Sequence, residues 1–154
     1  MRYQELHALA QRVAIDHPEF FEIKGPGKGD KCTERFMAKL RSEAARLFGA
    51  DFAEAGICGD GIASKVDFYF ADEGSVVEIA LTLKNASNEY EKDFFKVLLA
   101  KAAGARIERL VFISKPGAIK RRAEPLPRAI AKWVKLHHGI DTIILELTPQ
   151  RPTA

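Results

Sequence analysis

The chain is poor in the features that mark several classes of protein. It has only two cysteines, Cys32 and Cys58, among 154 residues. Two cysteines do not make a disulfide framework, and these two are not spaced as zinc ligands, so we expect free thiols in a cytoplasmic protein. No apolar run approaches the roughly 20 residues that span a bilayer, and the first residues lack the apolar centre of a signal peptide. We therefore expect neither secretion nor association with a membrane.

The chain also lacks a strong excess of charge and any segment of biased composition. The formal net charge is +3, so the placement of the basic residues matters more than their sum. No glycine-rich, proline-rich or highly charged block indicates disorder or a second domain. With 47% hydrophobic residues the chain can bury a core. We predict a single domain over residues 1–154, in which residues 148–154 are a flexible tail.

Apolar periodicity predicts the order of the secondary structure. Helical spacing covers residues 2–15, 33–48 and 88–103 and a last helix that follows Pro127 and ends near residue 138. Alternating or continuous apolar residues predict strands over 51–58, 65–70, 75–84, 109–114 and 141–147. A hairpin followed by strands that alternate with helices is typical of a mixed α/β layered fold.

The strongest pattern is the pair of strands over residues 65–70 and 75–84. Residues 71–74 form the turn between them, and a four-residue turn places Asp67 directly opposite Glu78. Facing residues have Cβ atoms about 4.5–5.5 Å apart, so the two carboxylates would repel each other. A divalent cation such as Mg²⁺ or Mn²⁺ between them would remove the repulsion. The alternative is a solvated acidic face, although apolar neighbours on that face favour partial burial.

This arrangement resembles the PD-(D/E)xK nuclease superfamily, which includes restriction endonucleases and archaeal-type Holliday junction resolvases. The resemblance covers about residues 28–114. It implies a restriction-endonuclease-like three-layer α/β fold, with a mixed central sheet built on the β-hairpin and flanked by helices in the order ααβββαβαβ. It assigns Asp67 as the first metal ligand and Glu78 as the acidic residue of the (D/E)xK element, and the Ile79 carbonyl would complete the coordination.

The start of the second predicted helix adds to the resemblance. Lys28-Gly29 followed by Glu34-Arg35 is similar to the entry motif of the resolvases, in which the glutamate approaches the metal. Glu43, at the edge of the apolar stripe of the same helix, is a rival for this role.

One position departs from the family pattern, because the lysine expected two residues after Glu78 is Ala80. Lys65 faces Ala80 in the predicted register and is our first candidate to replace that lysine. Helices rise about 1.5 Å per residue and strands about 3.3 Å, so a helix returning from residue 88 draws level with Ala80 near Lys96 and with Glu78 near Lys101. Plain solvent exposure is the alternative for Lys96, and Lys101 can extend its amine to solvent.

Two basic loops are candidates to contact DNA phosphates without reading sequence. One precedes the second helix and the other follows the fourth strand, and their residues are Lys24, Lys28, Lys31, Lys115, Lys120, Arg121 and Arg122. Solubilising surface charge is an equal alternative for either loop alone.

The resemblance implies a Mg²⁺- or Mn²⁺-dependent endonuclease that hydrolyses phosphodiester bonds in DNA, of restriction-like or junction-resolving type. Because Ala80 replaces the lysine, a non-catalytic nucleic-acid-binding module on the same fold is the alternative, and a small structural or interaction domain is a third. Nucleases that cut both strands commonly act as symmetric homodimers, but the sequence shows no dimer surface.

Overall fold

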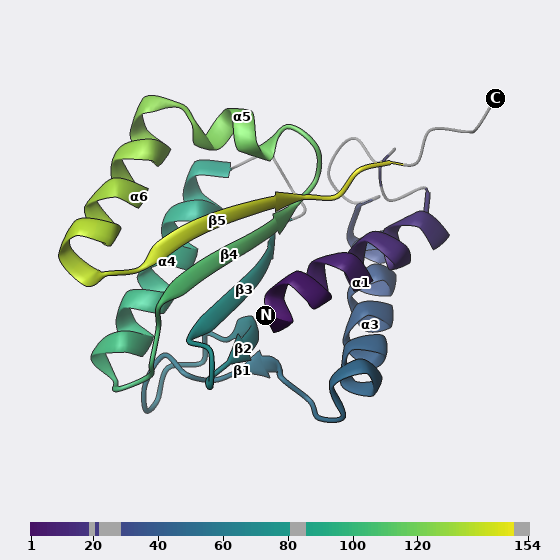
Figure 1. Cartoon of the computed structure of the whole chain (residues 1–154), viewed down its shortest axis with the longest axis horizontal. Coiled ribbons are helices and arrows are strands. Elements are labelled where there is room, and N and C mark those ends of the chain that lie inside the picture. The colour runs from purple at the N-terminus through teal and green to yellow at the C-terminus, as the bar shows by residue number, and fades with distance from the viewer. Residues whose placement is uncertain (19–20, 22–28, 81–85, 150–154) are drawn as a thin grey trace.

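A computed structural model describes residues 1–18, 21, 29–80 and 86–149 of the chain (Figure 1). In chain order its elements are α1 (Arg2–Asp16), α3 (Gly29–Phe48), β1 (Ala53–Ala55), β2 (Val66–Phe70), β3 (Ser75–Ala80), α4 (Ala86–Ala102), β4 (Arg109–Ser114), α5 (Ala118–Arg122), α6 (Pro125–His138) and β5 (Asp141–Glu146). Among these residues, no helix combines the length and the apolar character needed to cross a membrane.

The β2–β3 hairpin forms in the predicted register. Phe68 pairs with Val77 and Phe70 with Ser75 in an antiparallel ladder. The Gly74 amide donates to the Ala71 carbonyl at 3.3 Å and closes the four-residue turn. Gly74 has a φ of 62°, a left-handed conformation that favours glycine. The prediction that residues 71–74 form the turn is confirmed, and continuing this register by one residue places Asp67 opposite Glu78.

The hairpin supplies two strands of a five-stranded mixed sheet. The strands lie in the order β1-β2-β3-β4-β5. β1, β2 and β3 are antiparallel, whereas β3, β4 and β5 are parallel. Parallel neighbours need crossover connections, which α4 and the α5–α6 segment provide (Figure 1). The prediction of a mixed α/β fold with a hairpin and crossover helices is confirmed.

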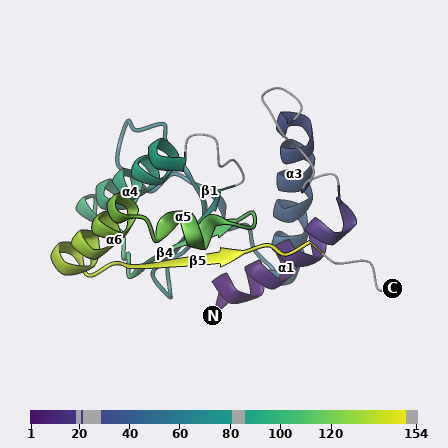
Figure 2. The same ribbon diagram turned by 90° about the horizontal axis from the view of Figure 1, so that it is seen from above.

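The two faces of the sheet pack against different helices, and alternation along β3 assigns each residue to a face. Val77 and Ile79 join a cluster that contains residues of α1 and α3. Val76 and Ala80 join a second cluster, with residues of α4 and α6. Figure 2 shows α1 beside α3 and, apart from them, α4 beside α6. Glu78, which alternates with Val77 and Ile79, therefore faces α4.

Two predicted segments differ from the structure, and a third is described only in part. The strand expected over residues 51–58 is only Ala53–Ala55, where the Asp51 carboxylate accepts a hydrogen bond from the Ala53 amide at 2.9 Å and Glu54 has a φ of 49°. The strand expected over 75–84 is described to Ala80, and residues 81–84 lie outside the described residues. The basic loop expected over residues 115–122 contains the helix α5.

Glu146 on β5 explains why a helix forms in this loop. Its carboxylate accepts hydrogen bonds from the amides of Gly117 at 2.8 Å and Ile119 at 3.2 Å, at the start of α5. Such a contact between distant segments leaves no periodic pattern in a helix of five residues.

Candidate active site

Asp67 and Glu78 lie on neighbouring strands at the face of the sheet that α4 covers. The Asp67 Oδ2 atom accepts a hydrogen bond from the Ile79 amide at 2.8 Å, which ties this carboxylate to β3 beside Glu78. Glu78 is 4% exposed and Asp67 is half-buried. A carboxylate buried this deeply needs a positive partner.

Lys96 on α4 provides that partner. Its Nζ atom lies 2.7 Å from Glu78 Oε1 and 3.1 Å from Asp93 Oδ1. It also donates a hydrogen bond to the Lys65 carbonyl at 3.0 Å. The Lys96 side chain is only 12% exposed, so the alternative reading of this residue as plainly solvent-exposed is wrong.

The three lysines proposed to replace the missing family lysine thus lie in different surroundings. Lys96 contacts Glu78, whereas Lys65 is exposed and contributes its main-chain carbonyl to Lys96. The Lys101 amine donates a hydrogen bond to the His138 carbonyl and connects the ends of α4 and α6. Among the three, the structure brings Lys96 to Glu78.

Asp93 belongs to the same cluster, and the sequence reasoning missed it. It is 6% exposed and lies one helical turn before Lys96, the i,i+3 spacing at which side chains on a helix meet. That spacing was the available signal. The thiol of Cys58, free as predicted, donates to the Lys96 carbonyl at 3.6 Å and joins the loop before β2 to this turn of α4.

The cluster holds more negative than positive charge. Burial, followed by the charges of Asp93 and Asp67, raises the pKa of Glu78 to about 9. Burial lowers the pKa of Lys96, but Glu78 and Asp93 outweigh it and raise that pKa above its ordinary value. The Glu78 Oε1 atom is near Lys96 Nζ by distance, yet it is buried without a hydrogen bond of good geometry. One oxygen of Glu78 therefore retains the capacity to bind a further positive group.

This electrostatic balance predicts a pH-dependent effect of Glu78→Gln. The pKa of Glu78 is higher in the folded than in the unfolded chain, so its contribution to stability is fully present below about pH 4.5 and is lost as the pH rises towards 9. We therefore compare melting temperatures in EDTA. The difference between Glu78→Gln and the wild type should shift in favour of the variant by at least about 3 °C as the pH rises from 5 to 9. Glu43→Gln is the matched control, because the pKa of Glu43 is lowered by Lys39. A Glu78→Gln difference that stays constant with pH would contradict the assignment.

The two glutamates of α3 are not brought to this cluster. α3 packs on the opposite face of the sheet from Glu78, through residues such as Phe36 and Leu40. Glu34 is exposed, and Glu43 pairs with Lys39 at 3.2 Å and with Arg46 on its own helix. Within the described ranges, no group of three or more His, Cys, Asp and Glu side chains is arranged to hold a metal ion.

The basic residues predicted to contact DNA are divided among several environments. Lys24 and Lys28 lie outside the described residues, while Lys31 is exposed on the first turns of α3. In the second group, Lys115 is half-buried after β4, and Lys120 and Arg121 are exposed on α5.

Arg122 requires a correction, because we predicted it in a surface loop. It is 7% exposed, and its guanidinium carbon lies 3.9 Å from the centre of the Tyr90 ring. The helix α5 turns this side chain inwards, where a cation over an aromatic face is favourable. Burial lowers the pKa of Arg122, and the negative charge of the nearby Asp93 partly opposes this shift.

Comparison with known proteins gave no match to a family model, to a characterised protein or to a solved structure. The fold and the cluster around Glu78 therefore define the class of protein only as a mixed α/β domain with a buried acidic and lysine-containing site.

Proposed function

We propose that this chain is a metal-dependent DNA endonuclease of the PD-(D/E)xK kind, with a restriction-endonuclease-like fold, in which Lys96 replaces the lysine missing at Ala80. One observation carries the proposal. The Lys96 amine reaches Glu78 from α4, on the face of the sheet where Asp67 neighbours Glu78. Two acidic residues and one lysine are the functional groups that the resemblance requires.

The cluster fits a divalent cation on two grounds. Glu78 and Asp93 both contact a single lysine amine and Asp67 lies beside Glu78. Burial, followed by the charges of Asp93 and Asp67, raises the pKa of Glu78, which a bound cation would offset. The buried Glu78 Oε1 atom also lacks a well-directed hydrogen bond. Mg²⁺ and Mn²⁺ prefer carboxylate oxygens. Asp67 and Glu78 would hold the ion, which when bound polarises a phosphate and lowers the pKa of a water ligand.

Asp67 and Lys96 would have separate roles, and other residues of the chain orient each of them. Asp67 is oriented by the Ile79 amide, so its carboxylate is fixed before any ligand arrives. Lys96 is oriented by Asp93 and by the Lys65 carbonyl. From that position its amine would steady the negative charge on the scissile phosphate and orient the attacking water.

Basic residues beside this end of the sheet support DNA as the substrate. Ala80 pairs with Ser114, and these two residues end β3 and β4. Lys115 follows Ser114 directly, and Lys120 and Arg121 lie on α5, next to the ends of the parallel strands (Figure 1). Positive charge beside the ends of parallel strands would hold the phosphate backbone near the site.

Cleavage assays with matched variants test the proposal. Plasmid and branched DNA are incubated with Mg²⁺, with Mn²⁺ and with EDTA. We expect cleavage that requires the metal and that falls at least about 100-fold in Asp67→Asn. The asparagine side chain can still accept the hydrogen bond from the Ile79 main-chain amide, but it lacks the negative charge that binds the ion. Glu43→Gln, the rival metal ligand on the opposite face, should retain wild-type cleavage. Equal loss in both variants, or no cleavage by the wild type, would refute the proposal.

A non-catalytic DNA-binding module is the second candidate, and Ala80 together with the Lys96–Glu78 ion pair favours it. A lysine that only neutralises Glu78 would leave no requirement for a cation. Tight binding of DNA by the wild type without cleavage in either metal would select this candidate.

A further inference from the structure

Large apolar side chains gather on the solvent side of α4 and α6. Among the described residues, nine large hydrophobic side chains are exposed, and five of them lie on these two helices: Phe95, Leu99, Leu126, Trp133 and Leu136. We call these five residues the α4–α6 patch. Phe95 is 66% exposed, Trp133 51% and Leu136 76%. Single exposed residues are normal, but a cluster on neighbouring helices indicates a binding surface.

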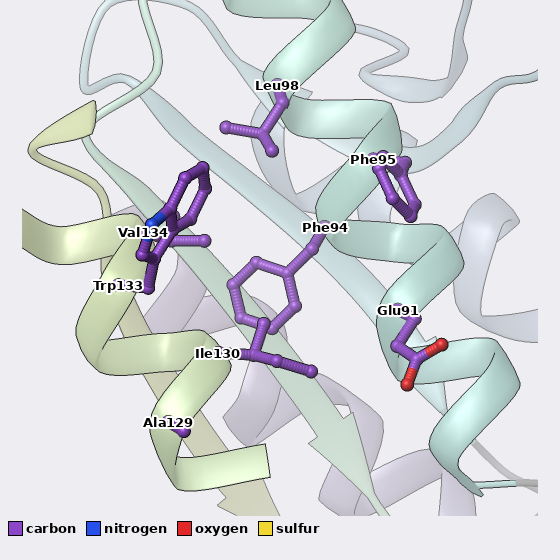
Figure 3. A pocket seen from close by; sticks show the side chains of 8 residues that line it. All are labelled: Glu91, Phe94, Phe95, Leu98, Ala129, Ile130, Trp133 and Val134. Carbon is purple, nitrogen blue, oxygen red and sulfur yellow. The ribbon is translucent and has the colours of Figure 1, made fainter. Parts of the chain in front are cut away.

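A groove runs between the two helices beside this patch. Its volume is about 540 Å³, and Phe94, Leu98, Ile130 and Trp133 line it together with Glu91 at one end. Figure 3 shows the side chains of Phe94 and Ile130 between the two helices, and the exposed ring of Phe95 on α4 also lines the groove. The face therefore offers both protruding rings and a hollow that can receive a ring.

From this face we propose that the chain forms a symmetric homodimer through α4 and α6. A twofold interface presents the same surface twice, so it needs protrusions and hollows on one face, as here. A large apolar side chain has a surface of about 150–250 Å². At their exposed fractions, the five side chains together present roughly 500 Å² to solvent. A stable interface buries about 800 Å² on each partner, which the patch, the groove walls and the flanking residues together approach.

Charge complementarity selects the arrangement of the two copies. α4 and α6 run in the same direction, because Tyr90 bonds to the Pro127 carbonyl at their first turns and Lys101 to the His138 carbonyl at their ends. A twofold axis perpendicular to α4 and α6 makes the two helices of one copy antiparallel to the two helices of the other. Glu91, near the start of α4, then meets the end of the partner's α6, whose last turn carries two histidines and Lys135, which also pairs with Asp141 of its own chain at 2.7 Å. Antiparallel packing also opposes the helix dipoles favourably.

This inference does not depend on nuclease activity, and sedimentation equilibrium of the full chain tests it. The wild type should sediment with twice the chain mass of 17.1 kDa. Phe95→Asp and Leu136→Asp should each weaken association at least ~100-fold, because each change occurs twice across the interface. Leu136 is so exposed that its replacement leaves the folded chain intact, as circular dichroism will verify. Leu47→Asp on α3, where Leu47 is 47% exposed, is the matched control and should remain dimeric.

Trp133 gives a second readout, because it is the one tryptophan of the chain and belongs to the patch. Its fluorescence should shift to shorter wavelength as the protein concentration rises, and this shift should be absent in Leu136→Asp. A wild type that is monomeric at all concentrations overturns the proposal, whether or not another protein covers the patch. A dimer that survives both Phe95→Asp and Leu136→Asp overturns it as well.

Discussion

Lys96→Met is expected to reduce DNA cleavage by about 10²–10³-fold, the effect of removing one positioned charged or proton-donating group from an active site. The reason is the position of the amine, 2.7 Å from Glu78 and held by Asp93 at 3.1 Å. Lys65→Met and Lys101→Met are matched controls, since Lys65 is exposed and Lys101 bonds to His138. Both should cleave within about threefold of the wild type. Wild-type activity in Lys96→Met, or its loss in Lys65→Met, would contradict the role given to Lys96.

A lysine moved back to position 80 sharpens this test. Ala80 lies at the end of β3, on the same face as Glu78, where the resemblance expects a lysine. The double variant Ala80→Lys/Lys96→Met should therefore recover at least about tenfold of the lost cleavage. Recovery would show that the amine, rather than the packing of α4, is what cleavage requires. Assays are run well below the melting temperature of each variant, so that loss of folded protein is not mistaken for loss of chemistry.

Lys96→Met should also destabilise the folded chain by about 3 kcal/mol, which lowers the melting temperature by roughly 10 °C in a domain of this size. The lysine side chain is 12% exposed and the glutamate side chain 5%, so the substitution leaves Glu78 and Asp93 buried without their shared partner. Thermal unfolding at pH 10 measures the effect, because Glu78, whose pKa is raised to about 9 mainly by burial, is then ionised. Lys101→Met, which removes an exposed amine, should change stability by no more than about 0.5 kcal/mol.

The double variant Glu78→Gln/Lys96→Met separates an uncompensated charge from lost packing. Removing both members of the ion pair should restore at least half of the stability lost in Lys96→Met. Asp93 remains charged in this variant, but the nearby Arg122 partly offsets it. If the double variant is no more stable than Lys96→Met, the Lys96–Glu78 contact is not the source of the loss.

The hairpin could be predicted because its information is local. Alternation along β2 and β3 assigns each residue to a face, and a four-residue turn that ends in Gly74 sets the pairing. A slip of one residue would have moved Phe68 and Phe70 out of the core, so the register is strongly specified. The position of Asp67 opposite Glu78 follows from this local pattern.

The partner of Glu78 could not be fixed in the same way. Counting helical rise placed Lys96 level with Ala80 and Lys101 level with Glu78, whereas in the structure Lys96 contacts Glu78 and Lys101 bonds to the His138 carbonyl. The face that α4 turns towards the sheet depends on how the whole helix docks. Lys96 lies outside the apolar arc of its helix, so its burial comes from Glu78 and Asp93 rather than from hydrophobic packing. The inward turn of Arg122 likewise depends on Tyr90, 32 positions earlier in the chain, and no local pattern predicts it.

The exposed residues of α4 and α6 illustrate a different limit. Hydrophobic periodicity predicts that a helix has an apolar face. It does not tell which of the apolar residues on the helix are buried by other parts of the same chain. Val134 on α6 is buried against the sheet, whereas Trp133 next to it remains on the surface. Only the assembled fold distinguishes the two.

The central claim is that Asp67 and Glu78 together bind a divalent cation. Binding of Mn²⁺, followed by electron paramagnetic resonance, tests this claim without requiring DNA or cleavage. We expect one Mn²⁺ per chain at neutral pH, displaced by excess Mg²⁺, retained in Glu43→Gln and lost in both Asp67→Asn and Glu78→Gln. Absence of binding to the wild type, or equal binding by Asp67→Asn, would contradict it.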